Sequence, residues 1–269
     1  MKRNDYLPQI TRNPLSAFFK GAGLPLRGLS FLLNNPRLWI FVLIPLVINA
    51  ILFVILLTWG YSAFSDVLKS WLGSWDTLAW YWKSVAVVAR IFFWLVALLA
   101  VYFIFTPSAL VIAAPFNDYL AETTEKACGL EYREERPLVA MIIKEAGFAI
   151  AGELKRVLFF GAVFLLLLPI NLVPFIGSVA YAIFSFVWAC FGFSFEFISF
   201  ATDRRHVSLN RKLAILRKNL PFTMGYGLVT LLLFLIPFVN VLIVPVSAVS
   251  GTLLFCTVVK SGSKREEAV

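Results

Sequence analysis

The sequence predicts an all-α integral membrane protein with two long transmembrane helices, two pairs of partly penetrating (re-entrant) helices and an N-terminal amphipathic interfacial helix. Three observations predict this class. Hydrophobic residues make up 60% of the 269 residues and charged residues only 14%, which is the composition of a membrane protein. The apolar residues fall into spans of membrane length. Two of these apolar stretches are broken near their middle by prolines.

Residues 14–34 are expected to form the amphipathic helix. Apolar side chains recur there at three- and four-residue steps, while polar side chains occupy the other face. The apolar ones are Leu15, Phe18, Phe19, Ala22, Leu26, Leu29 and Leu33. An anchor that orients the protein on lipid is a simpler interpretation than a ligand-binding helix.

Residues 38–61 and 90–115 are expected to cross the bilayer as the two long helices, because each is apolar over the length that a bilayer requires. Between them, residues 62–84 carry four tryptophans and balanced charge, which suits the water interface. Residues 116–156 form the longest polar stretch, and we expect them to continue as helices outside the bilayer.

The two interrupted pairs occupy residues 157–200 and 222–260. Each leading arm holds only about 12 to 14 residues, which reach roughly 20 Å at 1.5 Å per residue, against a hydrocarbon core of about 30 Å. We therefore expect both pairs to enter the membrane and return. Broken helices in corresponding positions of a repeat are typical of a transport site. Six full spans remain the alternative, because each pair returns to the side that it left.

Lysine and arginine indicate the orientation and the partners. They gather at the amino terminus, in the polar stretch, in the connector of residues 201–221 and in the tail of residues 261–269. Both termini are therefore predicted to be cytoplasmic. The net charge of +9 could suggest nucleic acid, but the basic residues flank apolar spans, so we expect no nucleic-acid partner.

Signatures of enzymes and metal sites are missing from the sequence. The sole histidine, His206, lies in the connector, and the three cysteines lack the spacing of a zinc site or a disulfide framework. We therefore expect no catalytic residue, no metal and no cofactor.

The starts of the second arms are candidate anion-binding positions. If the pairs turn inside the membrane, these arms begin just after a proline, one at Gly177-Ser178 and the other at Val246-Ser247. Unpaired N–H groups and the positive end of the helix dipole would then point into the protein, where an oxyanion could bind. An equally good interpretation is that both serines only cap helices.

Polar residues within apolar sequence could line a path across the membrane. They are Asn49, Arg90, Asn171, Glu196 and Asn240. Each also has a simpler explanation. The asparagines could satisfy backbone groups that nearby prolines expose, and Arg90 could reach lipid headgroups. For Glu196 we favour an ion pair with Arg204 or Arg205 at the membrane surface.

Two motifs carry a resemblance to a known family. The first is the apolar run Phe41–Leu46, with Pro36 before it and Asn49 after it. The second, Ala113-Ala114-Pro115-Phe116-Asn117, ends the second span and is followed by Leu120, Ala121 and Glu122. On these motifs the chain resembles the CysZ sulfate-permease family, within the wider group of etoposide-induced-protein-like membrane proteins, over nearly its whole length.

The resemblance implies a channel-like permease that takes up sulfate, or a related oxyanion, for cysteine synthesis. It also implies a homo-oligomer in the bacterial inner membrane, in contact with lipid and built from two long helices and two partly penetrating pairs. Arg37 would attract the anion beside Leu38. Asn117 and Glu122 would shape the mouth of the path.

The chain departs from the family's pattern at this anion site. Family members carry glycine, an aliphatic residue and two arginines after the proline matched by Pro36, whereas this chain reads Arg37-Leu38-Trp39-Ile40. A dianion needs several charge-assisted donors to replace its water. Either Arg37 acts together with backbone N–H groups, or this member carries something else. The rival hypothesis is a non-transporting membrane scaffold that shapes lipid or holds partner proteins.

Overall fold

The computed structural model describes residues 6–11, 13–72, 80–130, 154–236 and 239–266, and over these residues it contains helices and no strand. The all-α class predicted from the sequence is therefore confirmed. The chain divides into two compact units. One is Ile40–Phe116, and the other combines Met1–Trp39 with Asn117–Val269.

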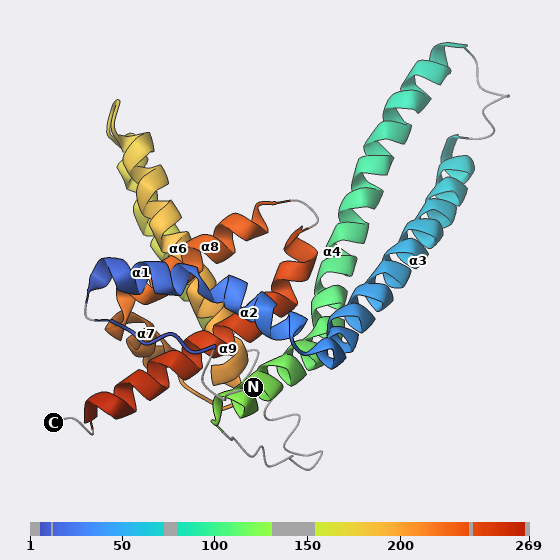
Figure 1. The fold of residues 1–269 in the computed structure, drawn as a ribbon. Helices are drawn as coiled ribbons and strands as arrows, with labels where there is room; N and C mark the ends of the chain where they lie inside the picture. Colours follow the sequence, from blue (N-terminus) through green and yellow to red (C-terminus); the bar gives the residue numbers. More distant parts are fainter. Residues whose placement is uncertain (1–5, 12, 73–79, 131–153, 237–238, 267–269) are drawn as a thin grey trace. The chain divides into compact units, whose positions relative to one another are not determined.

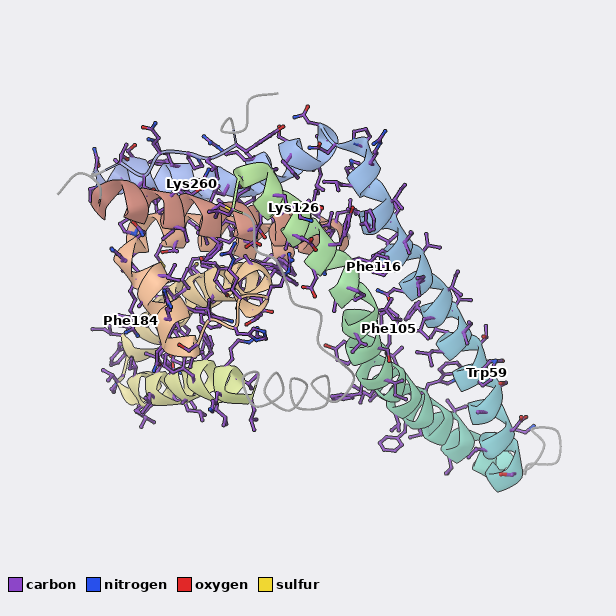
Figure 2. The ribbon with its side chains drawn as sticks, turned by 90° about the horizontal axis from the view of Figure 1, so that it is seen from below. Trp59, Phe105, Phe116, Lys126, Phe184 and Lys260 are labelled. Atoms are coloured by element: carbon purple, nitrogen blue, oxygen red, sulfur yellow. The ribbon has the colours of Figure 1, made fainter. Side chains whose placement is uncertain are left out.

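The unit Ile40–Phe116 is a pair of long helices lying side by side, α3 (Trp39–Leu72) and α4 (Trp80–Cys128) (Figure 1). Their 34 and 49 residues exceed the roughly 20 that a bilayer requires, because both helices continue into the tryptophan-rich segment and α4 also continues beyond the predicted span to Cys128. Phe53 of α3 packs on Phe105 of α4, with 5.2 Å between the ring centroids. Many other side chains point outward along the pair, and Trp59 is 75% exposed (Figure 2). This apolar outer surface suits contact with lipid.

The first interrupted pair is a helical hairpin. Residues 154–167 are helical, η3 (Leu168–Leu172) tightens the chain into a 3-10 turn, and α6 (Gly177–Asp203) returns. A Cβ atom on Gly177 would lie 2.2 Å from the carbonyl oxygen of Ile170, so only glycine lets the two arms meet this closely. The prediction that the second arm begins at Gly177 and Ser178 is confirmed.

The second interrupted pair follows the connector, which contains α7 (Leu209–Lys218). Its leading arm α8 (Leu220–Phe234) has 15 residues, or about 22 Å, as the sequence predicts. Its second arm α9 (Val239–Glu266) begins before Pro245 and continues through it. The prediction that this arm begins after Pro245 is wrong, because a proline removes only one donor of the helical ladder and helices in a packed environment tolerate that loss.

The amphipathic helix predicted for residues 14–34 is two helices, α1 (Pro14–Ala22) and α2 (Leu24–Leu33). The break falls at Gly23, and Pro25 fits the first turn of α2. α1 packs on α8 with Gly21 at the contact, and α2 packs on α9 with Gly28 at the contact and Phe31 buried beside it (Figure 1). The large apolar side chains Leu15, Phe19, Leu26 and Leu33 face outward and are more than 60% exposed. An outward apolar face of this kind suits a helix at the membrane interface.

The core lies where α6, α8 and α9 cross. A Cβ atom on Gly227 of α8 would lie 1.9 Å from the Cys190 carbonyl oxygen of α6, and one on Gly251 of α9 would lie 2.2 Å from the Phe197 carbonyl oxygen. Small residues at such crossings let helix backbones approach closely, as membrane helices commonly do. Of the apolar windows long enough to cross a membrane, that of α9 is 83% buried and that of residues 154–172 is 0% buried.

Candidate functional site

Arg37 stands at the head of the first long helix. It lies in η1 (Pro36–Leu38), which leads directly into α3. Its side chain is exposed and makes no ion pair with any residue that the structure describes. The neighbouring Leu38 is buried, and its N–H already donates to the carbonyl oxygen of Asn35 at 2.9 Å. Of this predicted pair, only the Arg37 guanidinium is placed to meet an anion.

Ser178 lies in the first turn of α6, where its side chain is exposed and forms no cap hydrogen bond. The Gly177 N–H already donates to the Val173 carbonyl oxygen at 3.0 Å. The next N–H groups of a helix have no partner inside it, so this turn presents donors and the positive end of the helix dipole beside the hairpin tip.

Ser247 does not occupy a helix terminus, contrary to the sequence prediction. It lies in the ninth position of α9 and is fully buried. Its carbonyl oxygen accepts a hydrogen bond from the Tyr226 hydroxyl at 3.3 Å, while its own hydroxyl has no partner among the described residues. Without the N–H groups of a first turn, Ser247 lacks the feature that made it a candidate anion site.

The polar residues predicted to line a path are scattered. Asn171 is exposed on η3 at the hairpin tip. Asn49 Nδ2 donates to the carbonyl oxygen of Ala109 on α4 at 3.4 Å, so it joins the two long helices rather than capping a carbonyl that a proline frees. The side chains of Arg90 and Asn240 lie outside the part of the chain that the structure describes.

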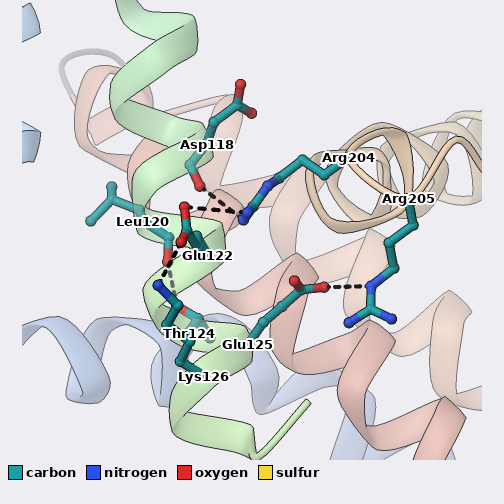
Figure 3. A network of polar contacts seen from close by, with 8 residues as sticks. All are labelled: Asp118, Leu120, Glu122, Thr124, Glu125, Lys126, Arg204 and Arg205. Atoms are coloured by element: carbon teal, nitrogen blue, oxygen red, sulfur yellow. Dashed lines mark hydrogen bonds and ion pairs between the residues drawn. The ribbon is translucent and has the colours of Figure 1, made fainter. Parts of the chain in front are cut away.

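Glu196 forms an ion pair, as the sequence predicts, but the partner is Arg156, at 2.9 Å, rather than either arginine of the connector. Those arginines bind the carboxylates at the end of α4 instead (Figure 3). Sequence alone could not identify the partners, because the choice depends on which helix ends the fold brings together.

A polar cluster joins the end of α4 to the end of α6 (Figure 3). Arg204 Nη2 lies 3.3 Å from Glu122 Oε2, and Arg204 Nη1 donates to the Asp118 carbonyl oxygen at 3.3 Å. Asn117, at the start of this part of α4, is buried. The predicted motif residues Asn117 and Glu122 therefore lie at an internal helix contact, with Arg204 as the cation that holds it.

Glu125, which the sequence did not single out, is the most buried carboxylate of this cluster. Its side chain is 2% exposed, and Arg205 Nε donates to its Oε1 at 3.1 Å. The Arg205 guanidinium also lies 5.2 Å from the centroid of the Phe255 ring. Burial raises the pKa of Glu125 above its ordinary value, and the charge of Arg205 opposes that rise. The only hint in the sequence was its position in a run of charged residues.

Lys212 completes the charged contacts at this end of α6. It lies in α7, is buried, and pairs with Asp203 at the end of α6. Its ammonium lies 5.6 Å from the centroid of the Phe195 ring. The Lys212 side chain is 8% exposed and the Asp203 side chain 64%, so the pair lets a buried ammonium reach a carboxylate at the surface. These contacts hold the connector against α6.

The fold and these sites define a multi-pass α-helical membrane protein. Four helical segments among the described residues are long and apolar enough to cross a membrane: Pro36–Ala63, Leu154–Leu172, Gly177–Asp203 and Leu242–Ser261. The described residues also contain no cluster of three or more residues that could hold a metal ion.

Comparison with known proteins gives the family. The chain belongs to the family described as "Sulfate transporter CysZ/Etoposide-induced protein 2.4", whose model matches residues 24–245. It is 33% identical over 236 residues to the "Sulfate transporter CysZ" of Pseudomonas aeruginosa strain PAO1. The aligned region covers 83% of this chain and 89% of that protein. The resemblance stated from the sequence is therefore confirmed.

Two further relatives carry the same name. The protein of Pseudomonas fluorescens strain Pf0-1 is 34% identical over 240 residues, which cover 85% of this chain and 89% of the relative. The protein of Pectobacterium atrosepticum is 24% identical over 252 residues, which cover 91% of this chain and 85% of the relative. The match therefore extends over nearly the full length of each of these proteins.

Proposed function

We propose that this protein is a permease that carries sulfate, or a closely related oxyanion, into the cytoplasm to supply sulfur for cysteine synthesis. The observation that carries the proposal is the family match over residues 24–245, which includes Arg37 and most of both interrupted pairs. Relatives that match over most of their length are named sulfate transporters.

Arg37 is the proposed first contact of the anion. Its exposed guanidinium has no competing carboxylate among the described residues, and it stands at the positive end of α3. Charge-assisted hydrogen bonds and helix N–H groups together are suited to replace the water of a dianion. This arrangement is how a single arginine can serve where the family pattern has two.

The first interrupted pair is the proposed membrane-penetrating element. Its tip carries large apolar side chains that are largely exposed: Leu172 at 83%, Phe175 at 101% and Ile176 at 70%. Such a tip is stable in lipid, and the first turn of α6 would bring unpaired donors to membrane depth with it. Two full spans alone cannot enclose a water-filled path, so neighbouring subunits would complete it in a homo-oligomer of the inner membrane, with both termini cytoplasmic.

Uptake of labelled sulfate into liposomes containing the purified protein tests the function. We expect uptake above that of empty liposomes, and we expect Arg37→Ala to lower the initial rate at least about tenfold, the size of a lost charged hydrogen bond. Arg211→Ala is the matched control, because Arg211 is also exposed and lies on α7. No uptake, with a known transporter active in parallel, would favour the scaffold hypothesis.

Cysteine accessibility at the hairpin tip tests the path. Asn171→Cys in a background without other cysteines should react with a membrane-impermeant maleimide from neither face, or only slowly from the cytoplasmic face. Arg211→Cys, in the basic connector, reports a cytoplasmic position. Rapid labelling of residue 171 from the periplasmic face would show that the pair crosses the membrane, and the re-entrant arrangement would then be abandoned.

A further inference from the structure

A cavity of about 210 Å³ lies between the start of α1 and the junction of α7 with α8. Ile10, Thr11 and Ala17 line it on the amino-terminal side, and Lys218, Asn219 and Phe222 line it on the other. All of these residues belong to one compact unit. The volume accommodates a small tetrahedral anion together with several water molecules.

Two polar groups at this cavity lack protein partners. The Thr11 hydroxyl oxygen is buried and forms no hydrogen bond with any described residue. Asn219 is 8% exposed and is the N-cap residue of α8, yet its side chain makes no cap hydrogen bond, so its amide is available to a ligand. Buried polar groups in folded proteins nearly always have partners, so the Thr11 hydroxyl indicates a bound species that supplies one.

The electrostatics of the cavity favour an anion. Lys218 contributes a full positive charge, and no acidic residue is among those that line the cavity. The 15-residue helix α8 begins at Leu220, and α1 begins at Pro14, so two helix N-termini open on the same space. Each helix contributes the positive end of its dipole. In α1, Pro14 has no N–H and the Leu15 N–H already donates to Asn13 Oδ1 at 3.0 Å, so the free first-turn N–H groups come chiefly from α8.

We propose that this cavity binds a tetrahedral oxyanion, either free sulfate or phosphate or the phosphate group of an anionic lipid. The Lys218 ammonium, the Thr11 hydroxyl and the Asn219 amide donate to its oxygens. The anion then bridges α1 to the start of α8, which are elements far apart in the sequence. This site is separate from Arg37 and does not depend on the transported substrate.

Binding is measured with the purified full-length protein carrying Arg37→Ala, so that the proposed substrate site does not contribute. Labelled sulfate and labelled inorganic phosphate are titrated in detergent. In a second arm, the protein is placed in nanodiscs of phosphatidylcholine with or without phosphatidylglycerol, and the thermal unfolding midpoint is recorded. Lys218→Met removes the charge and keeps the stem, and Arg211→Met is the matched control on an exposed position of α7.

We expect Lys218→Met to weaken anion binding at least about tenfold, while Arg211→Met changes it less than about twofold. Thr11→Val keeps the shape of the side chain and removes the unpaired hydroxyl. It should therefore raise the unfolding midpoint of the anion-free protein and reduce the gain on anion binding. If Thr11 had only a structural role, Thr11→Val would not both raise the midpoint of the anion-free protein and reduce the gain on anion binding.

The two arms distinguish the source of the anion. Binding of inorganic sulfate or phosphate that is lost in Lys218→Met identifies a free oxyanion. Stabilisation only by phosphatidylglycerol, lost in the same variant, identifies a lipid phosphate. The proposal is overturned if neither the free oxyanions nor phosphatidylglycerol binds. It is also overturned if Lys218→Met and Thr11→Val bind the anion as tightly as the protein that carries Arg37→Ala alone.

Discussion

The crossing of α6 and α8 allows a sharp test of the packing, the substitution Gly227→Ala. The added Cβ would lie 1.9 Å from the Cys190 carbonyl oxygen and 2.5 Å from the Ser194 hydroxyl oxygen. Ordinary contact requires the helices to separate by about 1.5 Å, which forfeits dispersion energy along the whole crossing. The hydrogen bond from Ser194 Oγ to the Thr223 carbonyl oxygen, 2.6 Å long, would be strained by the same movement.

The expected loss follows from these terms. Overpacking costs about 1–3 kcal/mol and a lost hydrogen bond about 1 kcal/mol, while alanine recovers up to about 1 kcal/mol of helix propensity. With the full propensity gain, the net loss in the free energy of unfolding is about 1–3 kcal/mol. Thermal or denaturant unfolding of the detergent-solubilised protein, followed by tryptophan fluorescence, measures it.

Gly161→Ala is the matched control. Gly161 also lies within a helix, but a Cβ there meets nothing within 4 Å. This variant should be neutral or more stable by up to about 1 kcal/mol. If both variants fall within about 0.5 kcal/mol of each other, the close crossing of α6 and α8 is refuted.

Three further predictions concern the charged cluster and the long helices. Arg205→Ala leaves the buried Glu125 carboxylate without its partner and should cost about 2–4 kcal/mol in denaturant unfolding, against less than about 1 kcal/mol for Lys126→Ala, whose ion pair is exposed. The pKa of Glu125 is raised in the folded state. The contribution of Glu125 to the free energy of unfolding is therefore most favourable when the pH is below the ordinary pKa of 4.5, and it is lost as the pH rises through the folded-state pKa. The unfolding midpoint of the parent relative to Glu125→Gln should therefore fall as pH rises above 4.5, and a flat difference would contradict the burial argument. Asn49→Leu should change stability by less than about 1 kcal/mol, since the hydrogen bond from Asn49 Nδ2 to Ala109 is long and the Asn49 Oδ1 atom is unpaired among the described residues. Unchanged sulfate uptake in this variant would remove Asn49 from the path.

The sequence predicted the elements whose signal is local. The apolar length of the first span, the short arm α8 and the start of α6 at Gly177 all follow from composition and from proline positions, and the structure has them. The predicted start of α9 was wrong because Pro245 lies inside the helix. Val246 and its neighbours are buried, and this packing keeps the helix continuous through the proline.

Contacts between distant elements could not be predicted in the same way. Nothing near Glu125 in the sequence indicates that Arg205, 80 residues later, becomes its partner. The cavity beside Lys218 is likewise formed by residues of two segments about 200 residues apart, 10–17 and 218–222. Such sites depend on which helix ends meet, and a single sequence contains that information only in the packing of the whole fold.

The two interrupted pairs look equivalent in sequence but have different environments in the structure. In the second pair α9 is enclosed by α2, α6 and α8, and the buried hydroxyls of Ser250 and Thr252 bond within the core. In the first pair the tip half of α6 is exposed and apolar, while its other half, from Cys190 onward, is buried with α8 and α9. A buried half fixes the helix in the protein, and an exposed apolar half has lipid or a neighbouring subunit as its natural environment. The tip of the first pair is therefore the part of this unit that lipid or a neighbouring subunit would cover, while the second pair belongs to the buried core of the unit.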